Sequence, residues 1–501
     1  MLMKNLLATK PVEPAPRVDA GEPVEGTLSG EASLKRVLTA RQLVMLGIGA
    51  VIGAGIFVLT GQAAAHYAGP AVVLSFVIAG IACAFAGLCY AEFASMLPVS
   101  GSAYSYAYAT LGEGVAWFIG WMLVLEYLFA ASTVAVGWSG YLNSFLGLFG
   151  AALPDALASA PLAYSKGTLT FTGAIVNLPA VAIVAAITGL CYVGITQSAF
   201  VNSIIVAVKV AVILLFIAFS LQFVNVDNWA PFIPPAEEGG RYGWLGVLRA
   251  ASIVFFAYIG FDAVSTAAGE AKNPQRDMPI GILGSLAICT LLYIIVSAVL
   301  TGLLPYSQLG TPKPVATALE AYPSLLWLKT LVEIGAIAGL SSVILVMLMG
   351  QPRIFYTMAK DGLLPRLFSR VHPKFRTPHV STIIVGVIAA TLAGLLPIGV
   401  LGDLVSMGTL LAFATVCVGV LVLRYTRPDL PRPFRVAFAP VVCTLGALAC
   451  LTLFTMAFLD NWHWMSAWIL VGIAVYFGYG YRHSRLRERA NGAASAQPVV
   501  R

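Results

Sequence analysis

Long apolar stretches, separated by short polar or proline-containing segments, run along most of the 501-residue chain. A helix needs about 20 predominantly apolar residues to cross a bilayer, and apolar segments of this length in lipid form helices because their backbone groups must bond to one another. The pattern predicts about twelve such helices, at approximately 42–64, 70–97, 115–147, 177–196, 199–223, 243–267, 279–303, 329–358, 380–396, 402–425, 436–458 and 463–481. The expected fold class is therefore an all-α integral membrane protein.

Two polar ends flank the apolar part of the chain. Residues 1–33 are rich in proline and glutamate and lack the apolar stretch of a cleavable signal peptide, so we expect a disordered N-terminal tail. We expect residues 34–482 to form one transmembrane domain and residues 483–501 to form a second tail.

The positions of the basic residues predict the orientation of the helices. If the N-terminus is cytoplasmic and the loops alternate, 23 of the 29 lysines and arginines fall on the cytoplasmic side and five outside, and Lys209 lies within a span. Cytoplasmic loops of membrane proteins carry such an excess of basic residues. We therefore expect both termini in the cytoplasm, and the net charge of +7 reflects topology rather than a nucleic-acid partner.

The composition agrees with a membrane protein and excludes several other classes. Hydrophobic residues make up 59% and charged residues 10% of the chain, against about 45–50% and about 25% in soluble domains. A soluble nucleic-acid binder, a secreted disulfide scaffold and a disordered protein are excluded. The seven cysteines lie in apolar runs without metal-binding spacing, the histidines are scattered, and no catalytic or phosphate-binding motif occurs. We expect no metal, no cofactor and no enzymatic activity.

The first and sixth predicted helices are interrupted by glycine. Gly47, Gly49, Gly53 and Gly55 fall within nine residues of the first helix, and Gly260 lies within the sixth, followed by Asp262. Small residues can serve close helix packing; alternatively, the first helix unwinds near Gly53–Gly55. Glycine-interrupted helices at corresponding positions of two halves are typical of a transporter binding site.

Two broken helices suit a zwitterionic ligand. The half-helix after a break presents free N–H groups and a positive dipole end, which attract a carboxylate. The half-helix before a break presents free carbonyls, which attract an ammonium group. Together they would bind an α-amino acid by the atoms that all amino acids share, leaving the side chain to a separate pocket.

Four motifs resemble the amino acid–polyamine–organocation superfamily, in particular the bacterial members of its cationic amino acid transporter family. They are Ile52–Phe57, Tyr90–Glu92 followed by Pro98–Tyr104, Glu270–Pro279 and Gly350–Tyr356. The resemblance covers about residues 34–482. It implies a five-plus-five inverted-repeat fold with broken helices 1 and 6, two further C-terminal helices, and amino acid transport.

The resemblance also implies roles for particular residues. The amides around Gly53–Gly55 would bind the substrate carboxylate and the carbonyls of the sixth helix the amine, with Phe256 as an aromatic lid; Ala130 and Met347 would face the substrate side chain. The substrate-binding residues expected are Ile52, Gly53, Ala54, Gly55, Ala130, Phe256, Ala257, Ile259 and Met347.

Lys209 has apolar neighbours on every face of the fifth predicted helix, where a charged side chain costs roughly 2.5–3.5 kcal/mol on insertion scales. One interpretation is a structural lysine that donates to unwound carbonyls. Burial disfavours the charged form of an amine, so a second interpretation is an amine that releases and rebinds a proton. In the family resembled, a fifth-helix lysine occupies the place of a sodium ion in other transporters of this fold, and this implies proton coupling.

Glu126 is the second charge that topology does not explain, because it lies in the middle of the third predicted helix. It would hold a proton, line the substrate cavity or pair with another group. Asp262 and Glu333 are weaker candidates, and local structural pairing explains them equally well. Ser341 and Ser342 are more simply explained by hydrogen bonds within their own helix.

These observations predict a plasma-membrane transporter that imports L-amino acids by alternating access, as a proton symporter and as a monomer. The alternative is an exchanger or facilitator of the same fold in which Lys209 keeps a fixed charge. A membrane-embedded enzyme would need acids or histidines clustered at one membrane face, and the sequence lacks them. A channel would need a pore filter, whereas two broken helices in matching halves favour a closed binding site. The sequence leaves open whether the substrates are neutral or cationic, with a preference for neutral ones.

Overall fold

The computed structural model describes residues 6–10, 38–97, 102–165, 168–194, 199–237, 239–268 and 271–488. Most of the two predicted tails therefore lies outside the described residues, as do residues 98–101 and 270 of the motifs quoted above. No described segment contradicts the expected helical fold, and the described part of the chain is mostly α-helical.

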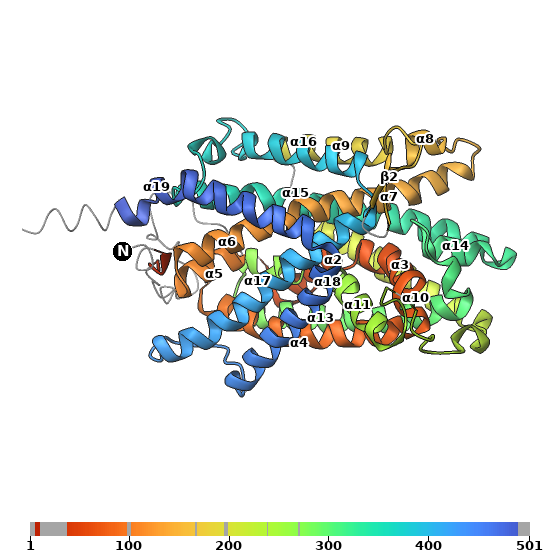
Figure 1. The fold of residues 1–501 in the computed structure, drawn as a ribbon, viewed down its shortest axis with the longest axis horizontal. Helices are drawn as coiled ribbons and strands as arrows, with labels where there is room; N and C mark the ends of the chain where they lie inside the picture. The colour runs from red at the N-terminus through yellow and green to blue at the C-terminus, as the bar shows by residue number, and fades with distance from the viewer. Residues whose placement is uncertain are drawn as a thin grey trace, which may run out of the picture.

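Many of the helices run along the longest axis of the molecule (Figure 1). The first half of the chain forms α2 (Ala40–Val51), α3 (Thr60–Ala63), α4 (Val72–Met96), α5 (Ser102–Thr110), α6 (Glu113–Val124), α7 (Ala130–Gly147), α8 (Asp155–Ala158), α9 (Leu178–Val193) and α10 (Ala199–Ser220). The second half forms α11 (Gly243–Val254), α12 (Ala263–Thr266), α13 (Pro274–Leu303), α14 (Pro314–Glu320), α15 (Leu326–Lys360), α16 (His379–Leu395), α17 (Ile398–Thr426), α18 (Ala439–Val475) and α19 (Tyr481–His483).

Short segments of other geometry join or interrupt these helices. The π-helical segments are η1 (Gly55–Leu59), η2 (Ala64–Ala68), η4 (Leu125–Phe129) and η12 (Tyr476–Gly480). The 3-10 segments are η3 (Gly69–Ala71), η5 (Leu221–Phe223), η6 (Val226–Trp229), η7 (Phe255–Tyr258), η9 (Tyr306–Gln308), η10 (Pro323–Leu325) and η11 (Arg366–Ser369). One antiparallel pair, β1 (Leu162–Ser165) and β2 (Thr168–Phe171), places Leu162 opposite Phe171.

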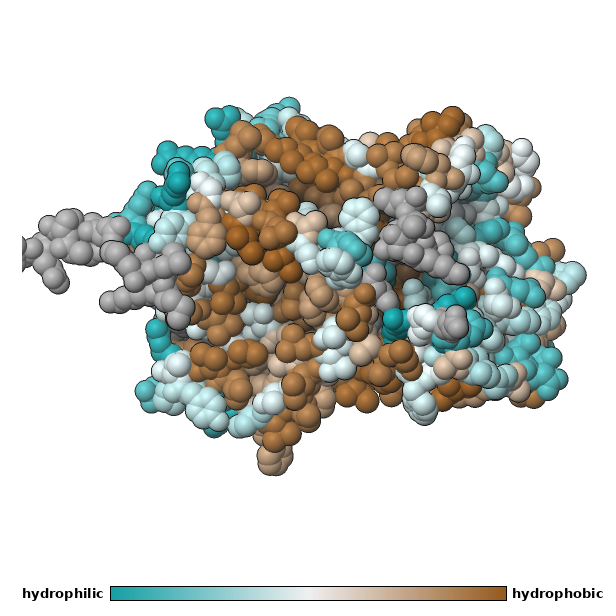
Figure 2. Space-filling model, in the orientation of Figure 1, coloured by the Kyte–Doolittle hydropathy of each residue, from teal (hydrophilic) through white to brown (hydrophobic). Residues whose placement is uncertain are grey.

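Nine segments of the described residues are long and apolar enough to cross a membrane. The first of them, Ala40–Met96, is 57 residues long and turns at Gly69, whose φ of +60° favours glycine. Two further apolar helices, α9 and α16, have 16 and 17 residues. Apolar side chains fill much of the middle of the molecule and polar ones gather toward its two ends (Figure 2). The expectation of an all-α membrane protein is confirmed.

The sequence predicts two separate helices at its C-terminal end, and two separate apolar segments occur there, Ala439–Leu459 and Asn461–Glu488; the range of α18 covers the kink between them. Asn461 interrupts α18 with φ −127° and ψ 25°, and its side chain donates to Asp403 of α17 over 2.8 Å. The kink therefore separates the two helical segments where the sequence predicts the turn.

Buried acidic side chains join segments at one end of the molecule, where the N-terminal segment and α19 both lie (Figure 1). Glu92 accepts hydrogen bonds from Arg424 Nε over 3.1 Å and from the Val436 amide over 2.8 Å. Glu113, fully buried, accepts from four side chains, those of Tyr108, Tyr476, Ser484 and Arg487. Asp361 accepts from Lys10 and Tyr104, each over 2.8 Å. These contacts fasten both ends of the described chain to the helical core.

Replacing Glu92 with glutamine tests the first of these contacts. Glu92→Gln removes the negative charge and leaves Arg424, whose side chain is only 15% exposed, without a counter-charge. Breaking a buried ion pair from one side costs about 3–5 kcal/mol, so we expect the thermal midpoint in detergent to fall accordingly. Glu237→Gln is the matched control, because its 3.8 Å pair with Arg241 is exposed and is worth at most about 1 kcal/mol. Equal midpoints for the two variants would contradict the expectation.

Candidate functional site

The first membrane segment is broken immediately after α2. Ile52 has φ −71° and ψ 101°, which is extended rather than helical, and the chain resumes as η1 at Gly55. A helix end leaves carbonyls, and a helix start leaves amides, without helical partners. The break therefore gives this apolar region a set of backbone groups that need other partners.

The second break follows η7, where Ile259 has φ −60° and ψ 133°. Gly260 then adopts φ +118°, and a Cβ there would lie 2.7 Å from the backbone of Ala50. A Cβ at Gly55 would lie 2.3 Å from the Cα of Ala257. Glycine at both positions thus lets the two broken segments touch through their backbones.

A small buried cavity lies between the two breaks. Its lining residues are Ala50, Val51, Gly53, Ala54, Gly55, Ala130, Val134, Phe256, Ile259, Val343 and Met347, and none of these side chains is charged. The cavity volume is about 10 Å³, so the side chains nearly fill it and the site is closed. Ala130 and Val134 of α7, and Val343 and Met347 of α15, are each spaced by four residues, which places each pair on one helix face.

Seven of the nine substrate-binding residues expected from the sequence line this one cavity. The other two do not appear in its lining: Ile52 turns its carbonyl to Lys209, and Ala257 packs against Gly55 with its carbonyl accepting a hydrogen bond from Tyr293. The carbonyl of Phe256 accepts from the amide of Ile259 over 3.1 Å and has a second lone pair free for another donor.

Lys209 of α10 meets the first break directly. Its Nζ donates to the carbonyl of Gly49 over 2.8 Å and to that of Ile52 over 3.0 Å, and the side chain is fully buried. Gly339 of α15 leaves space for the lysine stem, since a Cβ there would lie 2.9 Å from Lys209 Cε. The lysine therefore joins α10, the end of α2 and α15.

Glu126 and Asp262 lie beside each other and are both buried. Asp262 accepts hydrogen bonds from the Tyr127 hydroxyl and the Gly260 amide, each over 3.1 Å. The two oxygens of Glu126 have no hydrogen-bond partner among the described residues. Glu126 lies in η4, the segment that ends directly before Ala130. It does not line the cavity. The pair is thus placed next to the site rather than in it.

The remaining candidates have local partners. Glu333 accepts from Ser144 and lies 3.6 Å from Lys329. Ser341 donates to the Ile337 carbonyl over 2.8 Å, and Ser342 to that of Gly339 over 2.8 Å. Both serines therefore bond within their own helix.

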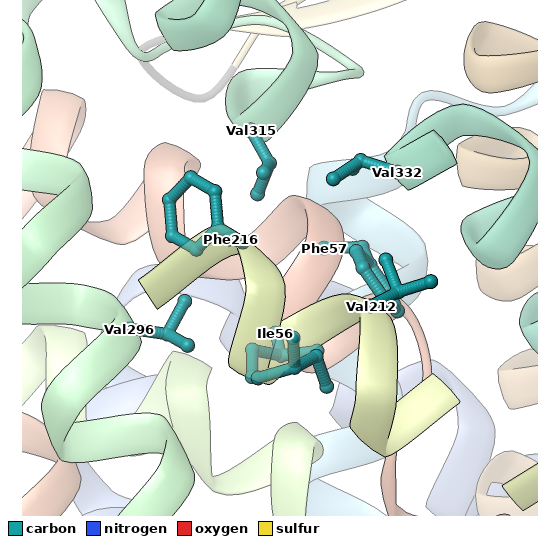
Figure 3. A pocket seen from close by; sticks show the side chains of 8 residues that line it. Ile56, Phe57, Val212, Phe216, Val296, Val315 and Val332 are labelled. Atoms are coloured by element: carbon teal, nitrogen blue, oxygen red, sulfur yellow. The ribbon is translucent and has the colours of Figure 1, made fainter. Parts of the chain in front are cut away.

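At the end of the molecule opposite the N-terminal segment, α14 packs against α15, α3 and η1 (Figure 1). Val315 of α14 and Val332 of α15 point toward Phe57 and Phe216 around a second apolar cavity of about 10 Å³ (Figure 3). Glu320, the last residue of α14, binds Lys313 and Lys329, each over 2.8 Å. Partial burial raises the pKa of Glu320, but the hydrogen bonds from the two lysines outweigh it and leave the pKa below its usual value.

Tyr293 of α13 is a site residue that the sequence analysis did not identify. Its hydroxyl lies 2.8 Å from the carbonyl of Val51 and 2.8 Å from that of Ala257, so it touches both breaks. A tyrosine in an apolar span carries no sequence signal of its own, because its role depends on which carbonyls are unwound.

Substituting Gly55 tests the close contact between the breaks. Gly55→Ala would press a methyl group onto Ala257, and overpacking of this kind costs about 1–3 kcal/mol. We expect a lower thermal midpoint in detergent. Gly189→Ala, in α9 with no atom within 4 Å of the new Cβ, is expected to leave the midpoint unchanged or to raise it, because alanine is favoured over glycine in helices by roughly 0.5–1 kcal/mol. A Gly55→Ala protein as stable as the Gly189→Ala protein would argue against the contact.

Comparison with known proteins places this geometry in a family. Residues 38–476 match the amino acid permease family model. The chain is 49% identical to the branched-chain amino acid permease BcaP of Bacillus subtilis over 92% of this chain and 96% of that protein. It is 47% identical to the methylthioribose transporter of Bacillus subtilis over 97% and 100% of the two chains, and 41% identical to the vacuolar cationic amino acid transporter 4 of Arabidopsis thaliana over 80% and 65%.

The interrupted apolar helices, the closed cavity between them and these similarities lead to one conclusion. The chain belongs to the amino acid permease family of the amino acid–polyamine–organocation superfamily, and it is a membrane transporter rather than an enzyme.

Proposed function

We propose that this permease imports neutral L-amino acids with apolar side chains across the plasma membrane, by alternating access and together with protons. One observation carries the proposal: two helix breaks face each other across a small cavity whose lining side chains are all uncharged. The breaks supply backbone groups for the charged ends of an amino acid, and the apolar lining supplies a surface for its side chain.

The substrate carboxylate would bind the amides at the start of η1, around Gly53–Gly55, where the helix dipole also favours an anion. The substrate ammonium would bind the carbonyls of Phe256, Ala257 and Ile259. The side chain would then face the two pairs on α7 and α15, which are Ala130 and Val134, and Val343 and Met347.

The lining favours neutral substrates over cationic ones. A buried charge is costly unless it is paired, and the buried acids Glu126 and Asp262 lie outside the lining of the cavity. The name of the branched-chain amino acid permease agrees with an apolar preference. The name of the methylthioribose transporter makes methylthioribose the compound to test beside the amino acids.

The same proposal includes the topology. Nine long apolar segments, a turn at Gly69 within the first of them, and the shorter helices α9 and α16 support twelve crossings in a five-plus-five inverted repeat with two additional helices. We further propose that residues 34–482 form the transport domain, that both tails are cytoplasmic, and that the monomer is functional. The nearly filled cavity corresponds to a closed state, so substrate enters when the broken helices move apart.

Proton coupling is assigned to Lys209. Its ammonium is buried, and its recorded partners are two carbonyls of the first break; among the described residues no salt bridge of Lys209 occurs. Release of the proton would remove the charge that holds these carbonyls, and the break would be free to move. Glu126 is the second candidate carrier. In the alternative function, exchange or facilitated transport, Lys209 keeps its charge throughout.

Replacing Lys209 with methionine separates these functions. In proteoliposomes, we expect the wild type to accumulate substrate when a pH gradient is imposed, and Lys209→Met to show only gradient-independent uptake while keeping counterflow. Lys272→Met, which removes an exposed lysine, is the matched control and should behave as the wild type. Wild-type uptake that is the same with and without a gradient would instead establish the exchanger or facilitator.

The substrate class is tested by competition in the same counterflow assay. Leucine, isoleucine, valine and alanine are expected to compete with the labelled substrate at least about tenfold better than lysine or arginine, because leaving a cationic side chain unpaired in the cavity costs well over 1.4 kcal/mol. Thermal stabilisation in detergent provides an independent readout. Preferential binding of arginine, lysine or methylthioribose would overturn the proposed substrate class.

A further inference from the structure

Tyr293 touches the two broken segments with a single atom. Its hydroxyl oxygen lies 2.8 Å from the carbonyl of Val51, the last residue of α2, and 2.8 Å from the carbonyl of Ala257 in η7. The side chain is fully buried. One hydroxyl thus spans the gap between the first and second breaks at the edge of the proposed amine site.

The hydrogen count at this contact is uneven. A tyrosine hydroxyl has one hydrogen to donate, whereas each carbonyl oxygen is an acceptor. Two carbonyls at equal distance therefore share one donor, and leaving a buried acceptor unsatisfied is unfavourable by about 1–3 kcal/mol. A substrate ammonium, which has three N–H donors, removes this deficit if it binds Ala257. The tyrosine hydrogen is then left entirely to Val51.

The tyrosine ring has little freedom to leave this position. Its centroid lies 5.4 Å from that of Phe76 on α4 and 5.4 Å from that of Tyr258 in η7, separations at which aromatic pairs attract. Because the ring is held, the hydroxyl can redirect its hydrogen between two carbonyls without moving away from either.

The carbonyl of Val51 lies in the same turn as the two carbonyls that accept from Lys209, those of Gly49 and Ile52. Hydrogen bonds therefore link Ala257 through Tyr293 to Val51, and the turn that contains Val51 is bonded through Gly49 and Ile52 to Lys209. In the part of the chain that the structure describes, the other titratable side chains that face Lys209 or Tyr293 are Cys289 of α13, Tyr258 of η7 and Cys83 of α4.

We infer that Tyr293 is a positioning residue that couples occupation of the amine site to the first helix break and so to Lys209. The inference rests on the proposed function, because it links the proposed substrate site to the proposed proton site. When an ammonium occupies Ala257, the hydroxyl bonds fully to Val51 and fixes the end of α2 in the arrangement that Lys209 also holds. When the site is empty, the hydroxyl divides its hydrogen, and the end of α2 is held less firmly.

Tyr293→Phe removes the hydroxyl and keeps the ring contacts. The matched control is Tyr141→Phe, because the Tyr141 hydroxyl is also fully buried and donates over 2.6 Å to a carbonyl of the same broken segment, that of Phe57, beyond the break. Both variants and the wild type are reconstituted, and the ratio of pH-driven accumulation to counterflow of labelled leucine is measured for each. We expect this ratio to fall about fivefold or more in Tyr293→Phe, a typical lower value for coupling between sites, and to be unchanged in Tyr141→Phe.

The possible results are distinguishable. If the pH gradient drives accumulation by the wild type and Tyr293→Phe has the same ratio as the wild type, the coupling role is overturned and proton symport stands. If the pH gradient does not drive accumulation by the wild type, both proton symport and the coupling role are overturned. If Tyr293→Phe lacks counterflow, the thermal stabilisation by leucine is measured at two pH values on either side of neutrality, about 5.5 and about 8.5. If this stabilisation depends on pH in the wild type and in Tyr141→Phe but not in Tyr293→Phe, the coupling role is supported. If Tyr293→Phe shows the same pH dependence as the wild type, the coupling role is overturned.

Discussion

The need of every buried backbone group for a hydrogen-bond partner governs this structure. An unbroken helix meets that need internally, but the first segment stops being helical at Ile52 and the second at Ile259. Both interruptions lie where water cannot compensate, so other parts of the protein must supply donors or the ligand must do so. Among the described residues, the side chains of Lys209 and Tyr293 donate to carbonyls of the first break.

This constraint explains why polar and apolar features divide so sharply around the cavity. In the proposed function, backbone groups would bind the parts of an amino acid that never vary, and apolar lining side chains such as Val343 and Met347 would face the part that does. An uncharged lining would be a poor site for an ion, but beside two broken helices it would suit a zwitterion, as the proposed function requires. Glycine at 55 and 260 is then required by contact rather than by flexibility, since each leaves space for the backbone of the other segment.

The sequence is informative where one residue type has one physical meaning. Long apolar stretches predicted the helical membrane fold, clustered glycines pointed to the first break, and a lysine amid aliphatic residues drew attention to Lys209. The sequence does not predict the role of a residue when that role depends on which partner the tertiary packing brings close to it. Nothing in the chain predicts that Tyr293 reaches Val51 and Ala257, or that Glu92 meets Arg424 more than 300 residues away. Glu126 shows the intermediate case: its importance was predictable, but its position beside Asp262 was not.

The closed cavity also gives the two ends of the molecule a physical role. Ion pairs are weak in water and strengthen where they are partly buried, and here they gather at the ends: Glu92, Glu113 and Asp361 at one, Glu320 with its two lysines at the other. The centre is held by apolar packing and by hydrogen bonds that Lys209 and Tyr293 donate to carbonyls, and a substrate ammonium could donate to such carbonyls in their place. In the proposed transport cycle, movement of the broken helices would exchange interactions at the centre for bonds to the substrate, whereas opening either end would separate charged groups. We therefore expect the ends, rather than the binding site, to set the larger part of the cost of opening.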